Sequence, residues 1–479
     1  MLDVLLVAVT LFLVLRASRS FPVLHGVTEW LLIGLTVFSA NQLRRHAFPV
    51  RLSEVWARFV PGAAHLFVVV RLVLIAAVLF LLLRWARRDR SALVRVTYLV
   101  LLIVSPFALW GVGRALTEIV RGGLAPGFAG REFVGESAAV TDKNAPRVVI
   151  ALFDMTDFGI AFARRPSSLT LPAFDALRHE ALFATNADSP IEGTLRALPS
   201  LLTGAVVDSA EPLGPGHLQL YPRNGDPVRF GGGPTLFSEL RQLGMESSLV
   251  GWYHPYCAIF ESQLESCWSA PVGGRRMLAG QMHDQARSAM SMAPATGAVR
   301  NWGEAHTRLV DLQRDAALRF IADGRSRLVF LHLAVPHWPW IFDRTARHEV
   351  LLDPARADGY LDNLALADSI LAQLLQSVDS RTSVIVTADH AFGKPPWRSE
   401  GPPSLTPDRR VPFIVRLAGQ TQPLDYDRPT NTIVLSSLTT RILEGKVRTL
   451  DELRRWLDAA SVAVTDSAVA FRSAASAMR

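Results

Sequence analysis

Carboxylates, an imidazole and a hydroxyl occur in this sequence directly after apolar runs, where they could bind a cation and act on a phosphate. Asp389 and His390 are adjacent, and a carboxylate beside an imidazole is a plausible pair of metal ligands. Asp154 could add a carboxylate, with helix capping as its alternative role. Thr194 opens an apolar-periodic segment, so its hydroxyl would face the unpaired N–H groups at a helix start. The residues alone favour a cap there and leave an oxygen nucleophile open.

The segments around these residues predict an α/β fold, with a parallel-type sheet flanked by helices. Continuous β-branched runs are typical of buried strands, and apolar residues at helical spacing predict helices. The expected strands are Arg147–Phe153, Ser326–Ala334, Thr382–Thr387 and Val411–Val415. The expected helices are Pro172–His179, a helix opened by Thr194, and Tyr360–Val378. Because ligands bind beyond the carboxyl ends of parallel strands, the polar groups there are expected to share one cleft.

Three histidines and one further carboxylate have competing interpretations. His337 lies just after a predicted strand, in a turn walled by Pro and Trp. His332 lies inside that strand, and we expect it to be a satisfied core histidine or a support for a ligand. His254, in GWYHPYC, is expected to be structural, with a place on the acceptor side of a site as the alternative. Asp157 could be a second carboxylate beside Asp154.

Two cysteines, Cys257 and Cys267, lie close together in a segment rich in Trp, Tyr and His. They are expected to form a local disulfide if this part of the chain lies outside the cytoplasm. Two unrelated thiols are the alternative.

The apolar residues are concentrated before Gly122, and this part of the chain predicts about four membrane helices. The apolar segments are Leu2–Leu15, Val27–Ala40, Ala63–Leu83 and Val96–Val112. The last two are long enough to cross a bilayer. The expected organisation is a transmembrane region over residues 1–120, a linker over 121–145 and a catalytic domain over 146–479.

The arginines between these segments predict how the chain lies in the membrane. Four spans can place either seven or four of these arginines inside, and the positive-inside rule favours seven. This arrangement places the large domain outside. We therefore expect a multi-pass protein of a bacterial inner membrane, with its catalytic domain facing the periplasm or exterior.

The composition argues against a nucleic-acid partner. The formal charge is +7, but the basic residues are nearly all Arg, and the lysines are Lys143, Lys394 and Lys446. No basic stripe is interleaved with aromatic residues, which is the pattern expected of a nucleic-acid surface.

The order of these motifs resembles the alkaline phosphatase superfamily, closest to its sulfatase-like branch and to membrane-anchored phosphoglycerol and phosphoethanolamine transferases. The resemblance covers roughly Arg147 to Trp456. TLRALPSLLTG resembles the nucleophile helix, which implies that Thr194 is the nucleophile. The first strand and TADHAFG resemble metal-binding motifs and imply a ligand set of Asp154, Thr194, Asp389 and His390. LHLAVPHWPW resembles the H-x-P segment and implies that His337 binds a phosphoryl oxygen.

The departures from the family pattern narrow what the resemblance implies. Thr194 replaces the Cys or Ser that sulfatases convert to formylglycine, which argues against sulfate-ester hydrolysis. No histidine lies between Gly393 and Val411, so the extra zinc-binding histidine of phosphoethanolamine transferases is missing. A one-metal site of the phosphoglycerol-transferase kind is implied, with Asp154 where those enzymes have Glu.

The resemblance implies transfer of a phosphoryl-linked headgroup, of phosphoglycerol or phosphoethanolamine type, through a covalent threonine intermediate. The donor would be a membrane lipid and the acceptor a glycan, lipid or other hydroxyl. The cofactor would be one divalent ion, Mn²⁺ or Mg²⁺ first, with Zn²⁺ or Ca²⁺ as alternatives. The competing interpretations are a phosphodiesterase or sulfatase-like hydrolase, and a non-catalytic membrane pseudoenzyme.

Overall fold

The computed structural model describes residues 131–135, 145–214, 217–271, 294–346, 348–349, 358–392 and 409–460. The chain divides into two compact units, and all the described residues belong to the unit Gly127–Arg276 with Ser291–Arg479. The membrane segments expected over residues 1–120 lie outside the described residues. Within the part that the structure describes, none of the helices combines the length and the apolar character that a membrane crossing requires.

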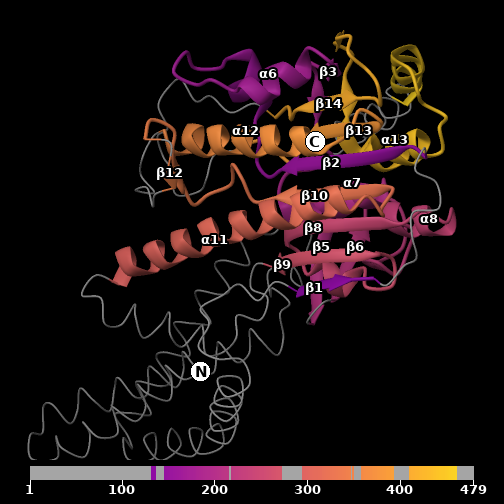
Figure 1. Cartoon of the computed structure of the whole chain (residues 1–479). Helices are drawn as coiled ribbons and strands as arrows, with labels where there is room; N and C mark the ends of the chain where they lie inside the picture. The colour runs from indigo at the N-terminus through magenta and orange to yellow at the C-terminus, as the bar shows by residue number, and fades with distance from the viewer. Residues whose placement is uncertain are drawn as a thin grey trace, which may run out of the picture. The chain divides into compact units, whose positions relative to one another are not determined.

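A nine-stranded sheet forms the centre of this unit (Figure 1). In spatial order its strands are β1 (Arg131–Val134), β9 (Ser266–Pro271), β8 (Ser247–Tyr253), β10 (Leu328–Leu333), β2 (Arg147–Phe153), β13 (Thr382–Thr387), β14 (Phe413–Arg416), β3 (Leu182–Ala184) and β15 (Leu424–Tyr426). The five strands from β9 to β13 are mutually parallel. β1 and β14 run antiparallel to their neighbours, so the parallel sheet expected from the sequence is the centre of a mixed one.

The strand predictions hold best at the centre of the sheet. β2 and β13 have the bounds that their β-branched runs predict, and β10 is two residues shorter at its start and one at its end. β1 lies within the stretch expected to be a linker, where it pairs with β9. That short edge strand carries no apolar alternation that the sequence would reveal.

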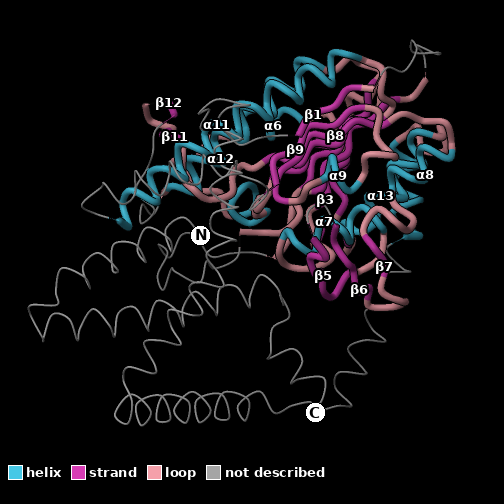
Figure 2. Tube along the Cα trace, turned by 90° about the horizontal axis from the view of Figure 1, so that it is seen from below, coloured by secondary structure: helices cyan, strands magenta, loops and turns pink. Residues whose placement is uncertain are grey.

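Helices cover both faces of the sheet, and the alternation of side chains along β2 separates two cores. Val149, Ala151 and Phe153 point to one core, and Val148, Ile150 and Leu152 point to the other. The first core is closed by α6 (Pro172–Arg178), α11 (Pro294–Asp323) and α12 (Gly359–Ser377). The second is closed by α7 (Thr194–Thr203), α8 (Leu236–Gln242), α9 (Tyr256–Ile259), α13 (Leu435–Leu443) and a helix over residues 450–460. Figure 2 shows α11 and α12 on one side of the strands and α8 and α13 on the other.

Smaller elements complete the described fold. Three small sheets of the described residues lie outside the main sheet. One has three strands, β5 (Val207–Gly214), β6 (His217–Pro222) and β7 (Val228–Arg229). The other two have two strands each, β4 (Ala187–Asp188) with β16 (Thr430–Asn431) and β11 (Phe342–Asp343) with β12 (His348–Glu349). The short helices are the π-helix η2 (Gly159–Ala163) and the 3-10 helix η3 (Thr432–Val434). α7 ends at Gly204, whose φ of 69° is the left-handed conformation that closes many helices and that glycine adopts without strain. This explains the glycine of the LTG motif.

Candidate active site

The ends of four neighbouring strands converge at one edge of the sheet. β8, β10, β2 and β13 are parallel neighbours, so their carboxyl ends lie together, where α/β sheets bind ligands. Asp154 directly follows β2, and Asp389 stands two residues beyond β13. His332 is the last but one residue of β10, and His254 directly follows β8.

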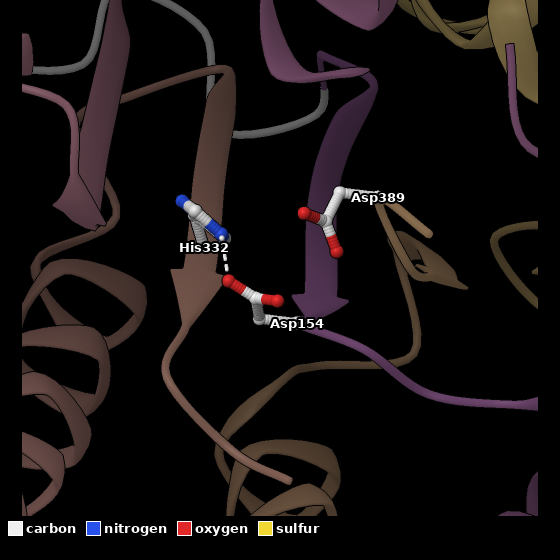
Figure 3. A group of neighbouring side chains, drawn as sticks. All are labelled: Asp154, His332 and Asp389. Atoms are coloured by element: carbon white, nitrogen blue, oxygen red, sulfur yellow. Dashed lines mark hydrogen bonds and ion pairs between the residues drawn. The ribbon is translucent and has the colours of Figure 1, made fainter. Parts of the chain in front are cut away.

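Asp154, His332 and Asp389 form the centre of this edge. One potential ligand atom from each lies within 4.8 Å of the others, and all three side chains are fully buried. Figure 3 shows the imidazole and the two carboxylates facing a common space, with His332 Nε2 3.3 Å from Asp154 Oδ2. Two acids and an imidazole in this arrangement are a donor set suited to a divalent cation.

His332 has the role expected of a support for a ligand, and the structure adds a second possibility. Its Nε2 lies 3.3 Å from Asp154 Oδ2, and it also lies close enough to Asp389 to be a candidate metal ligand itself. In the β10–β2 register His332 pairs with Leu152, so it lies on the same face of the sheet as Leu152 and Asp154. The alternation of side chains along β10 and β2 therefore places His332 on the face of Asp154, but this could be inferred only once the pairing of the two strands was known.

Thr194 is the first residue of α7, and its hydroxyl faces the carboxylates. Gly193 precedes the helix with a φ of 86°, and among the described residues no side chain caps this helix start. The Thr194 hydroxyl lies 3.4 Å from Asp154 Oδ2 and 3.3 Å from His390 Nε2. The capping role that the residues alone favoured is therefore wrong, and the oxygen is directed to the candidate metal ligands.

His390 presents one ring nitrogen to both acids. Its Nε2 lies 3.7 Å from Asp154 Oδ1 and 3.6 Å from Asp389 Oδ2. Its Nδ1 lies 2.8 Å from the carbonyl of Ala391, which can only accept, so Nδ1 carries a proton. In the neutral ring the lone pair is then on Nε2 and points to the carboxylates, which is the tautomer that a metal ligand needs.

The charges in the site also favour a bound cation. Burial alone would raise the pKa of Asp154, but the neighbouring imidazoles, chiefly those of His337 and His332, lower it to about 2. Burial, followed by the charge of Asp154, raises the pKa of Asp389. Burial lowers the pKa of His390, but the two carboxylates outweigh it and raise that pKa overall. The ionised acids thus repel one another in a buried place that attracts positive charge.

Two carboxylate oxygens in the site lack a donor. Within the described part of the chain, Asp154 Oδ1 and Asp389 Oδ2 are buried and have no hydrogen-bond partner. A buried polar atom left unpaired costs about 1–3 kcal/mol, and more if it is charged. A divalent cation would satisfy both oxygens at once, so Asp154, His332, Asp389 and His390 fit such an ion.

Backbone strain is located at the same strand ends. Met155 and Tyr253 are non-glycine residues with φ of 71° and 72°, and each lies beside a site residue, Asp154 or His254. This conformation costs of order 1–3 kcal/mol and persists where the surrounding structure enforces it. The unusual backbone of Met155 directs its N–H to Asp389 Oδ1 at 3.2 Å, which links the turns that carry the two acids.

The other predicted site residues lie in less direct positions. His254 is buried with Nε2 3.4 Å from the carbonyl of Thr194, and burial followed by the charge of His332 lowers its pKa to about 3. This contact favours the structural role, in which a neutral imidazole holds the start of α7. His337 is half-buried, with Nδ1 2.5 Å from the carbonyl of Trp338. Its contact with a phosphoryl oxygen stays a prediction. Asp157 accepts the N–H of Ile160 through Oδ1, as a turn residue does.

Cys257 and Cys267 are joined by a disulfide that connects α9 to β9. Tyr256, beside Cys257, is fully buried, and its hydroxyl lies 3.0 Å from His332 Nδ1. A partner on the second nitrogen of an imidazole holds the orientation of the ring, so Tyr256, which is anchored beside the disulfide, supports the candidate metal site.

Comparison with known proteins gives both a family and several structural likenesses. The structural likenesses include the lipoteichoic acid synthase LtaP from Listeria monocytogenes, at 12% identity and a TM-score of 0.38, over 64% of this chain and 75% of that one. They also include the phosphonate monoester hydrolase of Agrobacterium radiobacter, at 14% and 0.40, over 62% and 73%. A third is the PsFucS1 sulfatase from Pseudoalteromonas sp., at 13% and 0.40, over 71% of each chain.

A search of curated proteins finds no match. The Sulfatase family model, in contrast, matches residues 148–444, which include all but the first residue of β2, the whole of α7, β10 and β13, and every candidate metal ligand. This match confirms the resemblance that the order of motifs indicated. Since the matched region is more than half of the chain, the protein belongs to the sulfatase family and is a sulfatase-like enzyme, a hydrolase or a phosphotransferase.

Proposed function

We propose that this enzyme transfers a phosphoryl-linked headgroup, of phosphoglycerol or phosphoethanolamine type, from a membrane lipid to a hydroxyl acceptor. The observation that carries the proposal is the position of the Thr194 hydroxyl, 3.4 Å from Asp154 and 3.3 Å from His390 at the start of α7. A hydroxyl oxygen at the positive end of a helix and close to candidate metal ligands is suited to attack phosphorus.

The metal site supports this chemistry through its donor set. Asp154, His332, Asp389 and His390 would hold one divalent cation, Mn²⁺ or Mg²⁺ first, which lowers the pKa of a hydroxyl and offsets phosphate charge. The unpaired N–H groups at the start of α7 add a positive field where the phosphate oxygens would lie.

The transfer then has two half-reactions. Thr194 Oγ1 releases its proton to solvent and bonds to phosphorus, while the bond from phosphorus to the lipid alkoxide breaks. That alkoxide takes a proton from His337, which we assign as general acid. The acceptor hydroxyl next gives its proton to His337 and attacks phosphorus. The bond from phosphorus to Thr194 Oγ1 then breaks, and this oxygen takes up a proton from solvent. If water is the acceptor, the same site is a phosphodiesterase.

Two features of the sequence support a phosphate ester and a lipid donor. A threonine cannot be converted to the formylglycine that sulfatases of this family use, because it is neither Cys nor Ser. The apolar segments expected over residues 1–120 would hold the site at a membrane surface, where lipid headgroups are concentrated. We therefore place the protein in a bacterial inner membrane, with this domain facing the periplasm or exterior.

The test uses the full chain in proteoliposomes with Mn²⁺ and either phosphatidylglycerol or phosphatidylethanolamine as donor. Mass spectrometry of the peptide containing Thr194 after a short reaction should show one added headgroup phosphate, and its mass identifies the donor. Thr203→Ala is the matched control, because Thr203 closes the same helix with its hydroxyl bonded to Pro199. Full turnover by Thr194→Ala would rule out the covalent step.

A panel of soluble esters separates transfer from hydrolysis. We expect turnover of aryl phosphodiesters and little or none of aryl sulfates. Release of free headgroup from lipid at the same rate with and without a hydroxyl acceptor would identify a hydrolase instead.

A further inference from the structure

We propose that the N-terminal end of α12, residues 359–363, positions the two halves of the active site relative to each other. Asn363 would hold the turn that carries His337, and Tyr360 would hold the turn that follows Asp154. Neither side chain reaches the reacting atoms in this proposal, so both are positioning residues. The inference rests on the proposed function in taking His337 as the group that meets the substrate.

Asn363 binds the backbone of the His337 turn through both ends of its carboxamide. The side chain is fully buried, and its Oδ1 accepts the N–H of Ile341 at 2.9 Å. Its Nδ2 donates to the carbonyls of His337 and Pro339, each at 3.0 Å. The turn contains two prolines, which lack an N–H and limit its own hydrogen bonding. The carboxamide therefore supplies partners that the turn cannot supply itself.

Tyr360 binds the turn between the first carboxylate and η2. Its hydroxyl donates to the carbonyl of Met155 and accepts the N–H of Asp157, both at 2.9 Å. Burial raises the pKa of Tyr360 well above its ordinary value, so the hydroxyl keeps its proton and can serve both partners. Met155 in turn donates its N–H to Asp389 Oδ1, so Tyr360 supports the segment that links the two acids.

The two positioning residues lie on one face of the helix, because residues three apart are neighbours on a helix surface. The helix start is also packed against the His337 turn itself. A Cβ at Gly359 would lie 2.2 Å from Cδ1 of Trp340, so only glycine allows this buried tryptophan to lie there. The N-terminal end of α12 thereby connects the turn that follows Asp154 to the turn that carries His337.

Loss of these contacts should reduce activity although every proposed catalytic side chain is still present. A displacement of about 1 Å at a reacting group can cost roughly 10²-fold in rate. Asn363→Asp keeps the acceptor for Ile341 and removes the donors to the two carbonyls. Tyr360→Phe removes only the hydroxyl.

The first experiment is a double-mutant cycle in the full chain, with Asn363→Asp, His337→Ala and the double variant, and with an aryl phosphodiester as substrate. We expect Asn363→Asp to lower kcat/KM by about 10- to 100-fold. In the His337→Ala background it should add less than about twofold, because residues that act through each other are not additive. Mn²⁺ affinity, measured by calorimetry, should change by less than about threefold in Asn363→Asp.

Additive losses in the cycle would overturn the inference for Asn363, since a merely structural defect does not depend on His337. If Asn363→Asp does not fold, Asn363→Ser replaces it, because serine keeps one donor and one acceptor. His337→Ala that keeps full activity while Thr194→Ala loses it overturns the inference and leaves the covalent mechanism standing. Full activity in Thr194→Ala overturns the proposed function instead.

The second experiment tests Tyr360 by a readout other than turnover. Tyr360→Phe should weaken Mn²⁺ binding about 10- to 100-fold, as is typical when a support of a metal ligand is lost. Tyr426→Phe is the matched control, because it also removes a hydroxyl from a buried tyrosine, here one that donates to Asp458 on the helix over residues 450–460. Equal Mn²⁺ affinities in the two variants would overturn the role of Tyr360.

Discussion

The hydroxyl of Thr194 lies 3.4 Å from Oδ2 of Asp154, although 40 residues separate them along the chain. The contact exists because α7 packs on the face of the sheet to which Leu152 points, and Asp154 continues β2 on that same side. A helix start and a strand end are thus brought together by burial of apolar residues elsewhere. The Thr194 hydroxyl and the candidate metal ligand Asp154 are positioned by the core.

The hydroxyl of Thr194 is expected to be the group that matters at this position. Thr194→Ser retains the oxygen and removes a methyl group, so it should keep activity within about tenfold of the wild type. Thr194→Ala removes the nucleophile and should lower kcat by at least about 10³-fold. Aryl phosphodiester turnover with Mn²⁺ measures both. Equal activities in the two variants would contradict a nucleophilic role, whatever their level.

Removal of the second carboxylate should have opposite effects with and without metal. Asp389→Asn keeps an oxygen for the N–H of Met155 and removes a charge that Asp154 repels. The metal-free variant should therefore melt at a higher temperature than metal-free wild type. Mn²⁺ at 100 times its Kd should stabilise the wild type by about 2.7 kcal/mol and the variant by far less.

Thermal unfolding in EDTA and in excess Mn²⁺ checks both halves of this prediction. Asp379→Asn is a control, since Asp379 is an exposed carboxylate bonded to Thr382 at the start of β13. If Asp389→Asn gains as much stability from Mn²⁺ as the wild type does, the assignment of Asp389 as a metal ligand is contradicted.

The sequence predicted the parts of this site that depend on local pattern. β2 and β13 were found because a continuous β-branched run specifies a buried strand whatever its neighbours. The acids at their ends followed from the general position of ligands in parallel sheets. The proposed role of Thr194 as nucleophile came from the order of motifs, because its local pattern alone favoured a cap.

The missed parts depend on pairings between distant segments. His332 becomes a ligand candidate only when β10 is placed beside β2 in the observed register. Tyr360 and Asn363 occupy ordinary buried positions of an amphipathic helix, and their partners lie more than 20 residues away. β1 has four residues and is defined by its pairing with β9. No local pattern specifies such contacts.

Stability should fall below neutral pH because of His306. This histidine is buried on α11 with Nε2 3.2 Å from the carbonyl of Ala334, and burial lowers its pKa to about 3. In the unfolded chain its pKa is about 6.5, so between these values the unfolded state binds more protons. Stability from this group is complete above pH 6.5 and is lost as the pH falls toward 3, by about 2 kcal/mol at pH 5.

His306→Gln tests this, because glutamine can donate to Ala334 and does not titrate. Urea unfolding at pH 7 and pH 5 should show a smaller difference in the free energy of unfolding for the variant than for the wild type. His179→Gln, at the end of α6, serves as the control. An unchanged pH dependence in His306→Gln would show that the buried imidazole does not control it.

The disulfide should matter for both stability and the metal site. Cys257 and Cys267 close a loop with a sequence separation of 10, and closing a loop of this size stabilises a fold by about 3 kcal/mol in the chain-entropy model. Tyr256 directly precedes Cys257, and its hydroxyl lies 3.0 Å from His332 Nδ1. Replacing both cysteines by serine should therefore lower the melting temperature and weaken Mn²⁺ binding. Dithiothreitol should produce both changes in the wild type and neither in the variant.

Tyr256→Phe separates the two effects, because it keeps the disulfide and removes the hydroxyl. It should therefore weaken Mn²⁺ binding more than it lowers the melting temperature. If Tyr256→Phe binds Mn²⁺ as the wild type does, the loop stabilises the fold without supporting the metal site.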